Sequence, residues 1–233
     1  MKVLMIIPAY NEEENIKNTV EKIINYKKIK LDYIVINDGS KDNTKKVLDE
    51  NKFNYINLVN NSGIGAAVQT GYKYAFYNDY DIAIQFDGDG QHDINYVDRL
   101  IKEIEKNGYD MAIGSRFVGN ESTFKSTKSR RIGISILSFI LFILTGKKIK
   151  DMTSGYRAVN KKIIKEFAKD YDFEYPEPIT NLKIVKKKYK VIEVPVGMNE
   201  RKFGKSSINL YKSIYYMINV SITMLIFGIG RNK

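Results

Sequence analysis

Cysteine is absent from this chain of 233 residues, and histidine occurs once, at His92. The lack of cysteine excludes disulfides and thiolate metal sites, and a single histidine argues against a histidine-rich zinc site. We also expect no secretory signal peptide, because the N-terminal apolar stretch is short and acidic residues follow it at once. The 43% of hydrophobic residues suffice for one sizeable core, and we find no internal repeat or low-complexity linker.

Glycine is missing where a dinucleotide fold needs it. The stretch PAYNEE, which follows the first apolar run, contains none, although the fingerprint of such folds opens the helix after the first strand. Gly63 and Gly65 come much later, with Val68 where a third small residue belongs, and there is no P-loop lysine motif. The sequence therefore argues against NAD or FAD binding.

Positive charge is abundant, with a formal net charge of +11 and a pI near 9.4. Basic residues cluster at Phe124–Arg131, Gly146–Lys150 and Lys186–Lys190. Such clusters suit phosphates, nucleic acid or anionic lipid, and they can also simply decorate a solvated surface. A nucleic-acid binder is the weaker reading, because no RNA- or DNA-binding motif accompanies the charge.

Short apolar runs alternate with amphipathic stretches. We predict strands at Lys2–Pro8, Tyr33–Asp38, Tyr55–Val59, Asp81–Phe86, Asp110–Ser115 and Val191–Val196. Asn11 is expected to cap the first helix, with Glu12–Glu14 in its first turn, and Asp93 to cap a helix over Ile94–Lys106. Asp151–Asn160 reads as a polar turn. The alternation predicts an α/β fold, a Rossmann-like and mostly parallel sheet with helices on both faces.

Polar motifs follow the predicted strands directly, where ligands of parallel sheets collect. The most acidic is IQFDGDGQHD, from Ile84 to Asp93. Asp and Gly are common in surface turns, but Asp87 and Asp89 could equally reach one divalent ion, with Gln91 as a third oxygen ligand. Mg²⁺ typically binds through one or two carboxylates plus substrate phosphates. This acidic motif is compatible with the basic composition of the protein if one cleft binds both a metal ion and a diphosphate.

Seven motifs occur together in a fixed order: IIPAYNEEENI, VINDGSKDNT, NSGIGAAVQTGY, IQFDGDGQHD, IGSRF, DMTSGYRAVN and ERKFGKSS. This set resembles a family 2 glycosyltransferase with the GT-A fold, over nearly the whole chain. Within that family the sequence looks most like the polyprenyl-phosphate sugar transferases, such as dolichyl-phosphate mannose synthase, and short polysaccharide-assembly relatives.

The resemblance implies a set of site residues. Nucleotide-sugar binding falls to Pro8, Tyr10, Glu12, Asp38, Asp87 and Lys205. Catalytic roles fall to Asp89, Asp151, Glu177 and Arg201. Acceptor-phosphate binding falls to Arg116, Arg130 and Arg131. The metal, Mg²⁺ or Mn²⁺, falls to Asp87, Asp89 and Gln91. Ser154, Gly155 and Arg157 complete a family turn with Asp151. The family usually has two acids after the second strand, but here Asn37 replaces the first, which leaves the nucleotide base open.

The implied function is inverting, metal-dependent transfer of a sugar from a nucleoside diphosphate sugar to a polyprenyl phosphate or lipid-linked saccharide. A hydroxyl acceptor needs a base, which Asp151 or Glu177 could supply, although a turn cap and a helix N-terminal acid explain these two equally well. A lipid phosphate is already an anion and needs arginines to place it. The alternatives are a non-catalytic partner subunit of a membrane assembly complex and, less suited to the turn at Asp151, a nucleotidyltransferase.

Two apolar segments, at Ile132–Gly146 and Ser213–Gly230, bear on location. The first is short for a bilayer span and has basic flanks at Arg130, Arg131, Lys147 and Lys148. We expect a glycosyltransferase domain over residues 1–206, with 132–146 in the membrane interface, and a membrane- or partner-associated helix over 207–233. The expected location is the cytoplasmic face of the cell membrane. A small membrane protein or a second copy of the chain could be a partner.

Overall fold

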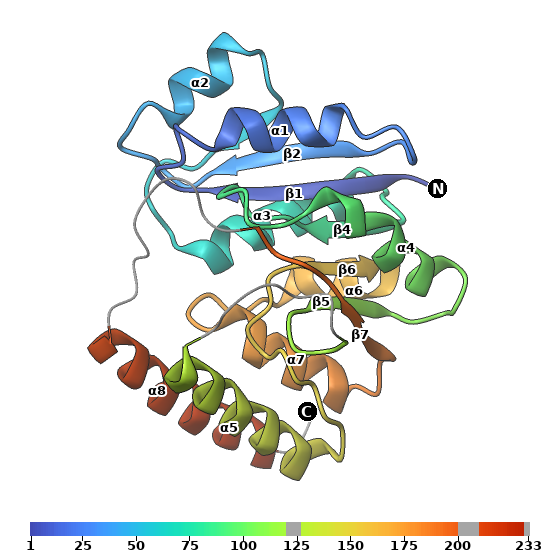
Figure 1. Ribbon diagram of the computed structural model, residues 1–233, viewed down its shortest axis with the longest axis vertical. Helices are drawn as coiled ribbons and strands as arrows, with labels where there is room; N and C mark the ends of the chain where they lie inside the picture. Colours follow the sequence, from blue (N-terminus) through green and yellow to red (C-terminus); the bar gives the residue numbers. More distant parts are fainter. Residues whose placement is uncertain (120–126, 200–209, 231–233) are drawn as a thin grey trace.

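A mostly parallel sheet of seven strands forms the centre of the computed structural model, which describes residues 1–119, 127–199 and 210–230 (Figure 1). In spatial order the strands are β3 (Tyr55–Asn57), β2 (Asp32–Asn37), β1 (Val3–Ala9), β4 (Ile82–Gln85), β6 (Arg157–Asn160), β5 (Met111–Ser115) and β7 (Val191–Pro195). All neighbours pair in parallel except β6, which is antiparallel to both β4 and β5.

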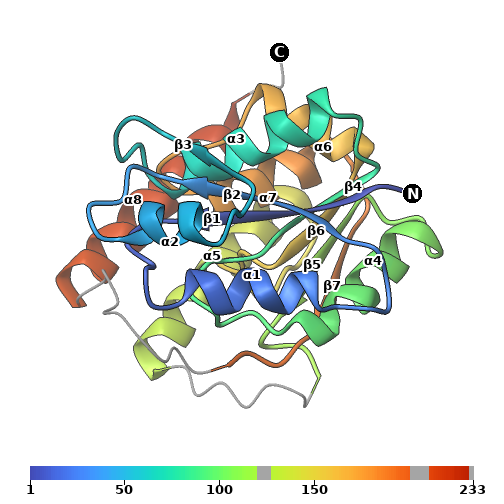
Figure 2. The same ribbon diagram turned by 90° about the horizontal axis from the view of Figure 1, so that it is seen from above.

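Helices cover both faces of the sheet (Figure 2). One face packs against α1 (Ile16–Ile24), α2 (Thr44–Glu50) and α4 (Val97–Glu105), the last preceded by the 3₁₀ turn η1 (Ile94–Tyr96). The core on the other face includes α3 (Ile64–Tyr77), α6 (Lys161–Lys169) and α7 (Pro176–Lys186). It extends to α5 (Lys128–Thr145) and α8 (Leu210–Ile229), which pack against α7 and each other. Because both faces are covered, every residue of β1 is buried, and the strand is one continuous apolar run.

The expected α/β architecture is confirmed, and all six predicted strands form with ends shifted by one or two residues. The strand β6 replaces the last four residues of the polar turn expected at Asp151–Asn160, whereas residues 151–156 form no strand or helix. The β6 residues, RAVN, carry no apolar run, and their extended form follows from pairing between β4 and β5. Tertiary pairing therefore decides this segment, which local pattern does not reveal.

The first helix begins later than expected. Asn11 adopts a left-handed conformation with φ of 55°, and α1 starts at Ile16 with Asn15 at the cap position. The expectation of an Asn11 cap with acids in the first turn is therefore wrong, since Glu12 lies before the helix and its carboxylate accepts a hydrogen bond from Asn15. The Asp93 cap is confirmed, because its carboxylate accepts the backbone N–H of Asn95 at the start of η1.

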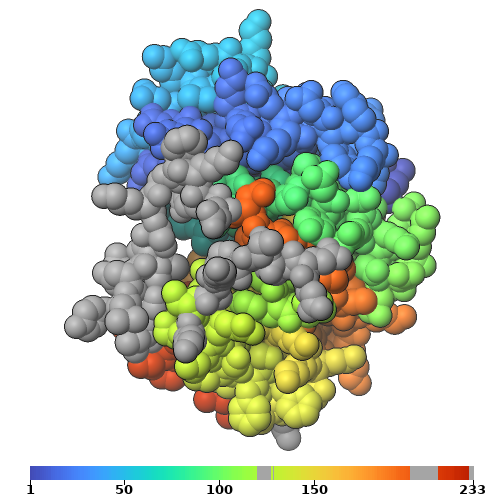
Figure 3. All heavy atoms as spheres, viewed as in Figure 1, coloured from blue at the N-terminus to red at the C-terminus, as the bar shows by residue number. Residues whose placement is uncertain are grey.

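The two apolar segments form α5 and α8, which run parallel at one end of the molecule (Figures 1 and 3). Near their starts, Gly133 lies so close to Met217 that a Cβ on the glycine would be 3.0 Å from the Met217 sulfur. Near their ends, Gly228 packs as closely on Leu144. None of the described helices is long and apolar enough to cross a membrane.

Candidate active site

The first four predicted motifs meet at the carboxyl ends of β1, β2 and β4. Pro8 is in β1, and the backbone N–H of Gly88 donates to its carbonyl at 3.2 Å. Asp38, directly after β2, is buried, and its carboxylate accepts the backbone N–H groups of Ser62 and Gly63 at 2.8 and 2.9 Å. Burial raises the pKa of Asp38, and these two hydrogen bonds oppose the shift. Asp38 thus ties the loop after β2 to the start of α3.

Tyr10 and Glu12 occupy the loop after β1. Tyr10 is exposed, whereas Glu12 is buried beside Asn15. The backbone N–H of Glu12 donates to the Thr44 hydroxyl at 2.8 Å, which joins this loop to the start of α2. Of the two predicted site residues on this loop, Tyr10 is therefore the one whose side chain a ligand could reach.

The acidic motif forms a tight loop after β4. Gln85 donates from Nε2 to the Asp87 carboxylate at 3.3 Å, and the Gln91 backbone N–H donates to the Asp89 carboxylate at 3.0 Å. Gly155 approaches from the neighbouring turn, where a Cβ would lie 2.7 Å from Nε2 of Gln85 and 3.2 Å from the Asp87 carboxylate. The loop is therefore packed from below, and Asp87 and Gln91 remain partly exposed.

A divalent cation fits this loop by donor chemistry. Asp87, Asp89 and Gln91 offer two carboxylates and an amide oxygen, which are the hard ligands that Mg²⁺ and Mn²⁺ prefer. No group of three acidic, histidine or cysteine side chains with metal-binding geometry occurs in the described part of the chain. The set therefore suits a cation that takes its remaining ligands from a substrate diphosphate and water.

His92 supports the acidic loop from behind. Its ring is buried and stacks on Tyr156, with centroids 4.6 Å apart. Burial lowers the pKa of His92 to about 4, so the neutral ring accepts the backbone N–H of Asp87 on Nδ1 at 3.0 Å. A β-bridge with Met198 joins this loop to the end of the chain segment that follows β7. Sequence reasoning noticed His92 only as the single histidine.

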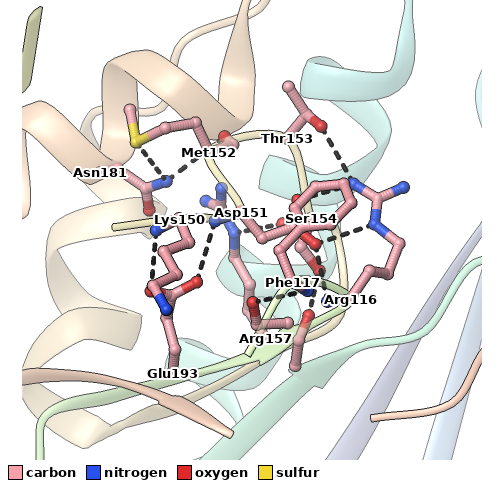
Figure 4. A network of polar contacts seen from close by, with 12 residues as sticks. Arg116, Phe117, Lys150, Asp151, Met152, Thr153, Ser154, Arg157, Asn181 and Glu193 are labelled. Carbon is pink, nitrogen blue, oxygen red and sulfur yellow. Dashed lines mark hydrogen bonds and ion pairs between the residues drawn. The ribbon is translucent and has the colours of Figure 1, made fainter. Parts of the chain in front are cut away.

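Arg116 and Asp151 form a buried ion pair (Figure 4). The Arg116 guanidinium donates to both oxygens of Asp151, at 2.8 and 2.7 Å, and its backbone N–H adds a third hydrogen bond at 2.9 Å. The backbone N–H groups of Lys150 and Asp151 in turn donate to the Glu193 carboxylate. The sequence analysis assigned Arg116 to the acceptor phosphate and Asp151 to catalysis. In the structure the two side chains bind each other.

Arg130 and Arg131 occupy the first turn of α5, and both are exposed. Partial removal from water lowers the pKa of Arg130, and the like charge of Arg116 adds to the shift. The Arg131 guanidinium lies over the ring of Phe117, 5.5 Å from its centre. Beside it opens a cleft of about 690 Å³, lined by Phe117, Arg131, Ile134, Ser135, Ser138, Phe139, Phe142, Lys148 and Lys150. The cleft combines apolar walls with three cations.

Glu177 lies in the first turn of α7, after Pro176, and is half-buried. Burial raises the pKa of its carboxyl, the positive charge of Arg157 opposes the shift, and the nearby Asp87 carboxylate adds to it. Arg157 is fully buried beside Gln85, its cross-strand neighbour. It donates to the Ser154 carbonyl and the Thr180 hydroxyl, both at 2.8 Å. Asp87 and Glu177 thus lie near one buried positive charge.

Arg201 and Lys205 lie outside the described residues. Every other predicted site residue lies along one edge of the sheet or at the adjoining helix ends. Gln85, which orients Asp87 and neighbours Arg157, escaped the sequence analysis because it stands inside an apolar strand pattern.

Comparison with known proteins places this geometry in a family. Residues 5–168 match the model of glycosyl transferase family 2. A dolichyl-phosphate N-acetylglucosaminyltransferase of Methanococcus voltae, which uses UDP-N-acetylglucosamine by its name, is 35% identical over 214 residues, covering 83% of this chain and 84% of the relative. A polyprenol monophosphomannose synthase of Mycolicibacterium smegmatis is 28% identical over 222 residues, covering 89% and 81%.

Among solved structures, a glucosyl-3-phosphoglycerate synthase of Mycobacterium tuberculosis, in complex with Mn²⁺, UDP and glucosyl-3-phosphoglycerate, superimposes with a TM-score of 0.70. It covers 100% of this chain and 81% of the mycobacterial one, at 17% sequence identity, so it supports the GT-A fold alone. The chain belongs to glycosyl transferase family 2 and is a glycosyltransferase. The family and fold expected from the sequence are confirmed.

Proposed function

We propose that this protein transfers a sugar from a nucleoside diphosphate sugar to a polyprenyl phosphate, with inversion at the anomeric carbon. The observation that carries the proposal is the cleft beside α5, because its apolar and cationic lining suits an amphipathic anion. The names of two relatives support it, since they specify dolichyl phosphate and polyprenol as acceptors.

The cleft has two chemically different parts. Phe139, Phe142 and Ile134 supply apolar surface for an isoprenoid chain, and Arg131 supplies a guanidinium for a phosphate. Lys148 and Lys150 add positive charge. Arg130, the neighbour of Arg131 in α5, adds a second guanidinium, and it lies close enough to the buried Arg116–Asp151 pair to be influenced by both charges.

The donor end is formed by the loops after β1, β2 and β4. Pro8, Tyr10, Glu12 and Asp38 are our candidates for nucleotide contacts, and Lys205 adds a cation. Asp87, Asp89 and Gln91 would hold Mg²⁺ or Mn²⁺, which would neutralise negative charge growing on the departing diphosphate. We assign Asp89 and Arg201 to the stabilisation of that departing diphosphate.

The acceptor decides the roles of the two remaining carboxylates. A phosphate monoester is an anion at neutral pH and needs no base, so Asp151 serves to hold Arg116 in place. Glu177, beside Asp87, is then free to contact the transferred sugar. If the acceptor were instead a saccharide hydroxyl, Glu177 would be the candidate base, since its raised pKa favours proton uptake.

We further propose that the protein binds the inner face of the cell membrane through α5 and α8. Each helix exposes an apolar stripe: Ile132, Ile136, Phe139 and Ile143 on α5, and Ile218, Ile222, Ile226 and Ile229 on α8. Basic side chains flank α5 at both ends, as in helices that lie in the membrane interface. A small membrane protein or a second copy could cover the same stripes, which is why the test uses bare vesicles.

Vesicle binding tests this location. Replacing Arg130, Arg131, Lys147 and Lys148 by Gln is expected to weaken binding to anionic vesicles by roughly 10²- to 10³-fold, because each basic residue near such a surface contributes about 1 kcal/mol. The control replaces Lys41, Lys45, Lys46 and Lys52, which are exposed around α2. Equal binding by both variants would contradict interfacial docking of α5.

The transfer assay offers UDP-, GDP- and dTDP-sugars with Mn²⁺ or Mg²⁺, each with and without undecaprenyl phosphate in detergent. Nucleotide release that requires the lipid phosphate, together with a lipid-linked sugar product, is the expected result. Release without lipid would indicate hydrolysis or a saccharide acceptor. Absence of release with every donor would favour the non-catalytic subunit of an assembly complex.

A further inference from the structure

Tyr216 turns inward from the C-terminal helix. The adjacent Tyr215 is 70% exposed, whereas Tyr216 is half-buried and packs edge-to-face on Tyr175, with ring centroids 5.3 Å apart and planes at 75°. Val220 and Met224 continue the same inward side of α8 and are fully buried. The helix lies beyond residues 5–168, to which the family match extends.

Contacts on both sides fix where Tyr216 lies. Met217 packs on Gly133, less than one turn after Arg130 in α5. Tyr175 directly precedes α7, whose first turn carries Glu177. Tyr216 therefore sits between the N-terminal ends of α5 and α7, where the candidate acceptor arginines and Glu177 lie. The electrostatics agree with this position: burial and the Glu177 carboxyl raise the pKa of Tyr216, and Tyr216 is among the groups that influence Arg130.

The Tyr216 hydroxyl can act only as a neutral group at neutral pH, since its pKa lies far above 7. A neutral phenol beside a guanidinium is a hydrogen-bond donor for an anion that the guanidinium attracts. Within the described part of the chain no hydrogen bond engages this hydroxyl. Arg131 lines the cleft, whereas Arg130 and Tyr216 are not among its lining residues. A phosphate that contacts Tyr216 would therefore bind beside the cleft, at the N-terminal end of α5.

We propose that Tyr216 is an acceptor-binding residue whose hydroxyl donates a hydrogen bond to the phosphate of the lipid acceptor. The proposal rests on the proposed function for the identity of that acceptor. It makes α8 part of the active site, in addition to any role at the membrane. A phosphate has enough oxygens to accept hydrogen bonds from Arg130 and Tyr216 at once.

The test measures equilibrium binding of farnesyl monophosphate to the full chain, with farnesol as the uncharged reference. Tyr216→Phe keeps the ring on Tyr175 and removes only the hydroxyl, and Tyr215→Phe is the matched control on the exposed side. We expect Tyr216→Phe to weaken farnesyl monophosphate binding about tenfold, in the range for a hydrogen bond to a charged group. Farnesol binding and thermal unfolding should stay unchanged, and Tyr215→Phe should bind like the wild type.

Three outcomes would overturn the inference. The first is equal farnesyl monophosphate affinity in wild type and Tyr216→Phe. The second is wild-type protein that binds farnesyl monophosphate no better than farnesol. The third is an equal loss in Tyr215→Phe, which would indicate a general effect on α8.

Failure of the proposed function is a separate result. If the wild type transfers no sugar but Tyr216→Phe still selectively weakens the binding of farnesyl monophosphate, the phosphate contact is supported and the proposed transfer reaction is refuted. If transfer is observed, Tyr216→Phe should raise KM for the lipid phosphate about tenfold and leave KM for the donor and kcat unchanged. A fall in kcat with unchanged phosphate affinity would contradict acceptor binding.

Discussion

The donor and acceptor ends of the proposed active site are built in different ways. The donor end consists of strand ends and the loops that directly follow parallel strands. Each of its side chains is positioned by its own strand or loop: Pro8, Tyr10, Glu12, Asp38, Asp87 and Asp89. The acceptor end gathers side chains from the turn after β5, the turn before β6, and α5, α7 and α8: Arg116, Asp151, Arg130, Glu177 and Tyr216. Local backbone geometry therefore positions the first set, and long-range packing positions the second.

This difference predicts where mutations will affect folding. Donor-end carboxylates at the loop surface are expected to matter for chemistry more than for stability. At the acceptor end, Arg116 and Asp151 are buried and paired, so losing either should destabilise the fold before it informs on catalysis. Four predictions test this contrast, in order of decreasing effect.

Asp151→Asn should lower the free energy of unfolding by about 3 to 5 kcal/mol, because it leaves the buried Arg116 guanidinium without its counter-charge. Chemical denaturation measures the change. Asp170→Asn, which breaks the more exposed pair with Lys183, is the control and should have little effect. If both variants unfold alike, the acceptor end does not depend on this pair.

Asp89→Asn should reduce kcat roughly 10²- to 10³-fold, the range for removing one group that stabilises charge in a transition state. Thermal unfolding should hardly change, because Asp89 lies in the loop after β4 and not in either core. Asp93→Asn, in the same loop region, is the matched control. Near-normal turnover of Asp89→Asn with Mn²⁺ would rule out the proposed metal site.

His92 should make stability depend on pH within the donor end. Its pKa of about 4 in the folded protein lies below the ordinary 6.5. Between pH 4 and pH 6.5 the histidine is therefore protonated in the unfolded chain and neutral in the folded chain. The contribution of His92 to stability is therefore full above pH 6.5 and falls by up to about 3 kcal/mol as the pH drops to 4. His92→Phe should remove this part of the slope. A constant stability difference between wild type and variant from pH 7 to pH 4 would refute the assignment.

Lys186→Met should have the smallest effect, about 1 kcal/mol on the stability of α8. Lys186 donates from Nζ to the carbonyls of Phe227, Gly228 and Gly230. Carbonyls at the end of a helix have no hydrogen-bond donor within the helix. Limited proteolysis should cleave α8 faster in this variant than in Lys187→Met, whose lysine pairs with Glu166 on α6. Equal cleavage would show that α7 does not hold the end of α8.

The sequence correctly placed the polar loops of the proposed donor end directly after their strands, because that information is local. A strand buried on both faces is a continuous apolar run, and a ligand-binding loop at its end is a polar break, so Asp87 and Asp89 stand out beside Phe86. Single-sequence pattern reading failed where conformation depends on distant partners. The four residues of β6 are strand only between β4 and β5.

The sequence singled out most of the acceptor-end residues as candidates, but it did not indicate which of them contact one another. Arg116 and Asp151 are 35 positions apart, and nothing in either motif says that they pair. Tyr216 was hidden in an apolar segment beside Tyr215. The spacing of Tyr216, Val220 and Met224 at every fourth residue does mark one side of a helix, but only packing against α5 and α7 reveals which side faces the site.

The strand order carries a consequence for synthesis. The four strands β3, β2, β1 and β4 are neighbours in the sheet and emerge first, so they can pair while the chain is still being made. Their next neighbour is β6, which leaves the ribosome after β5 although it lies between β4 and β5. The nascent chain must therefore hold β5 unpaired while about forty more residues are added, a wait of a few seconds at roughly 5 to 20 residues per second. Ribosome-bound chains stalled at a length at which β5 has left the exit tunnel but β6 has not should accordingly show protease protection of β1 to β4 and cleavage at β5.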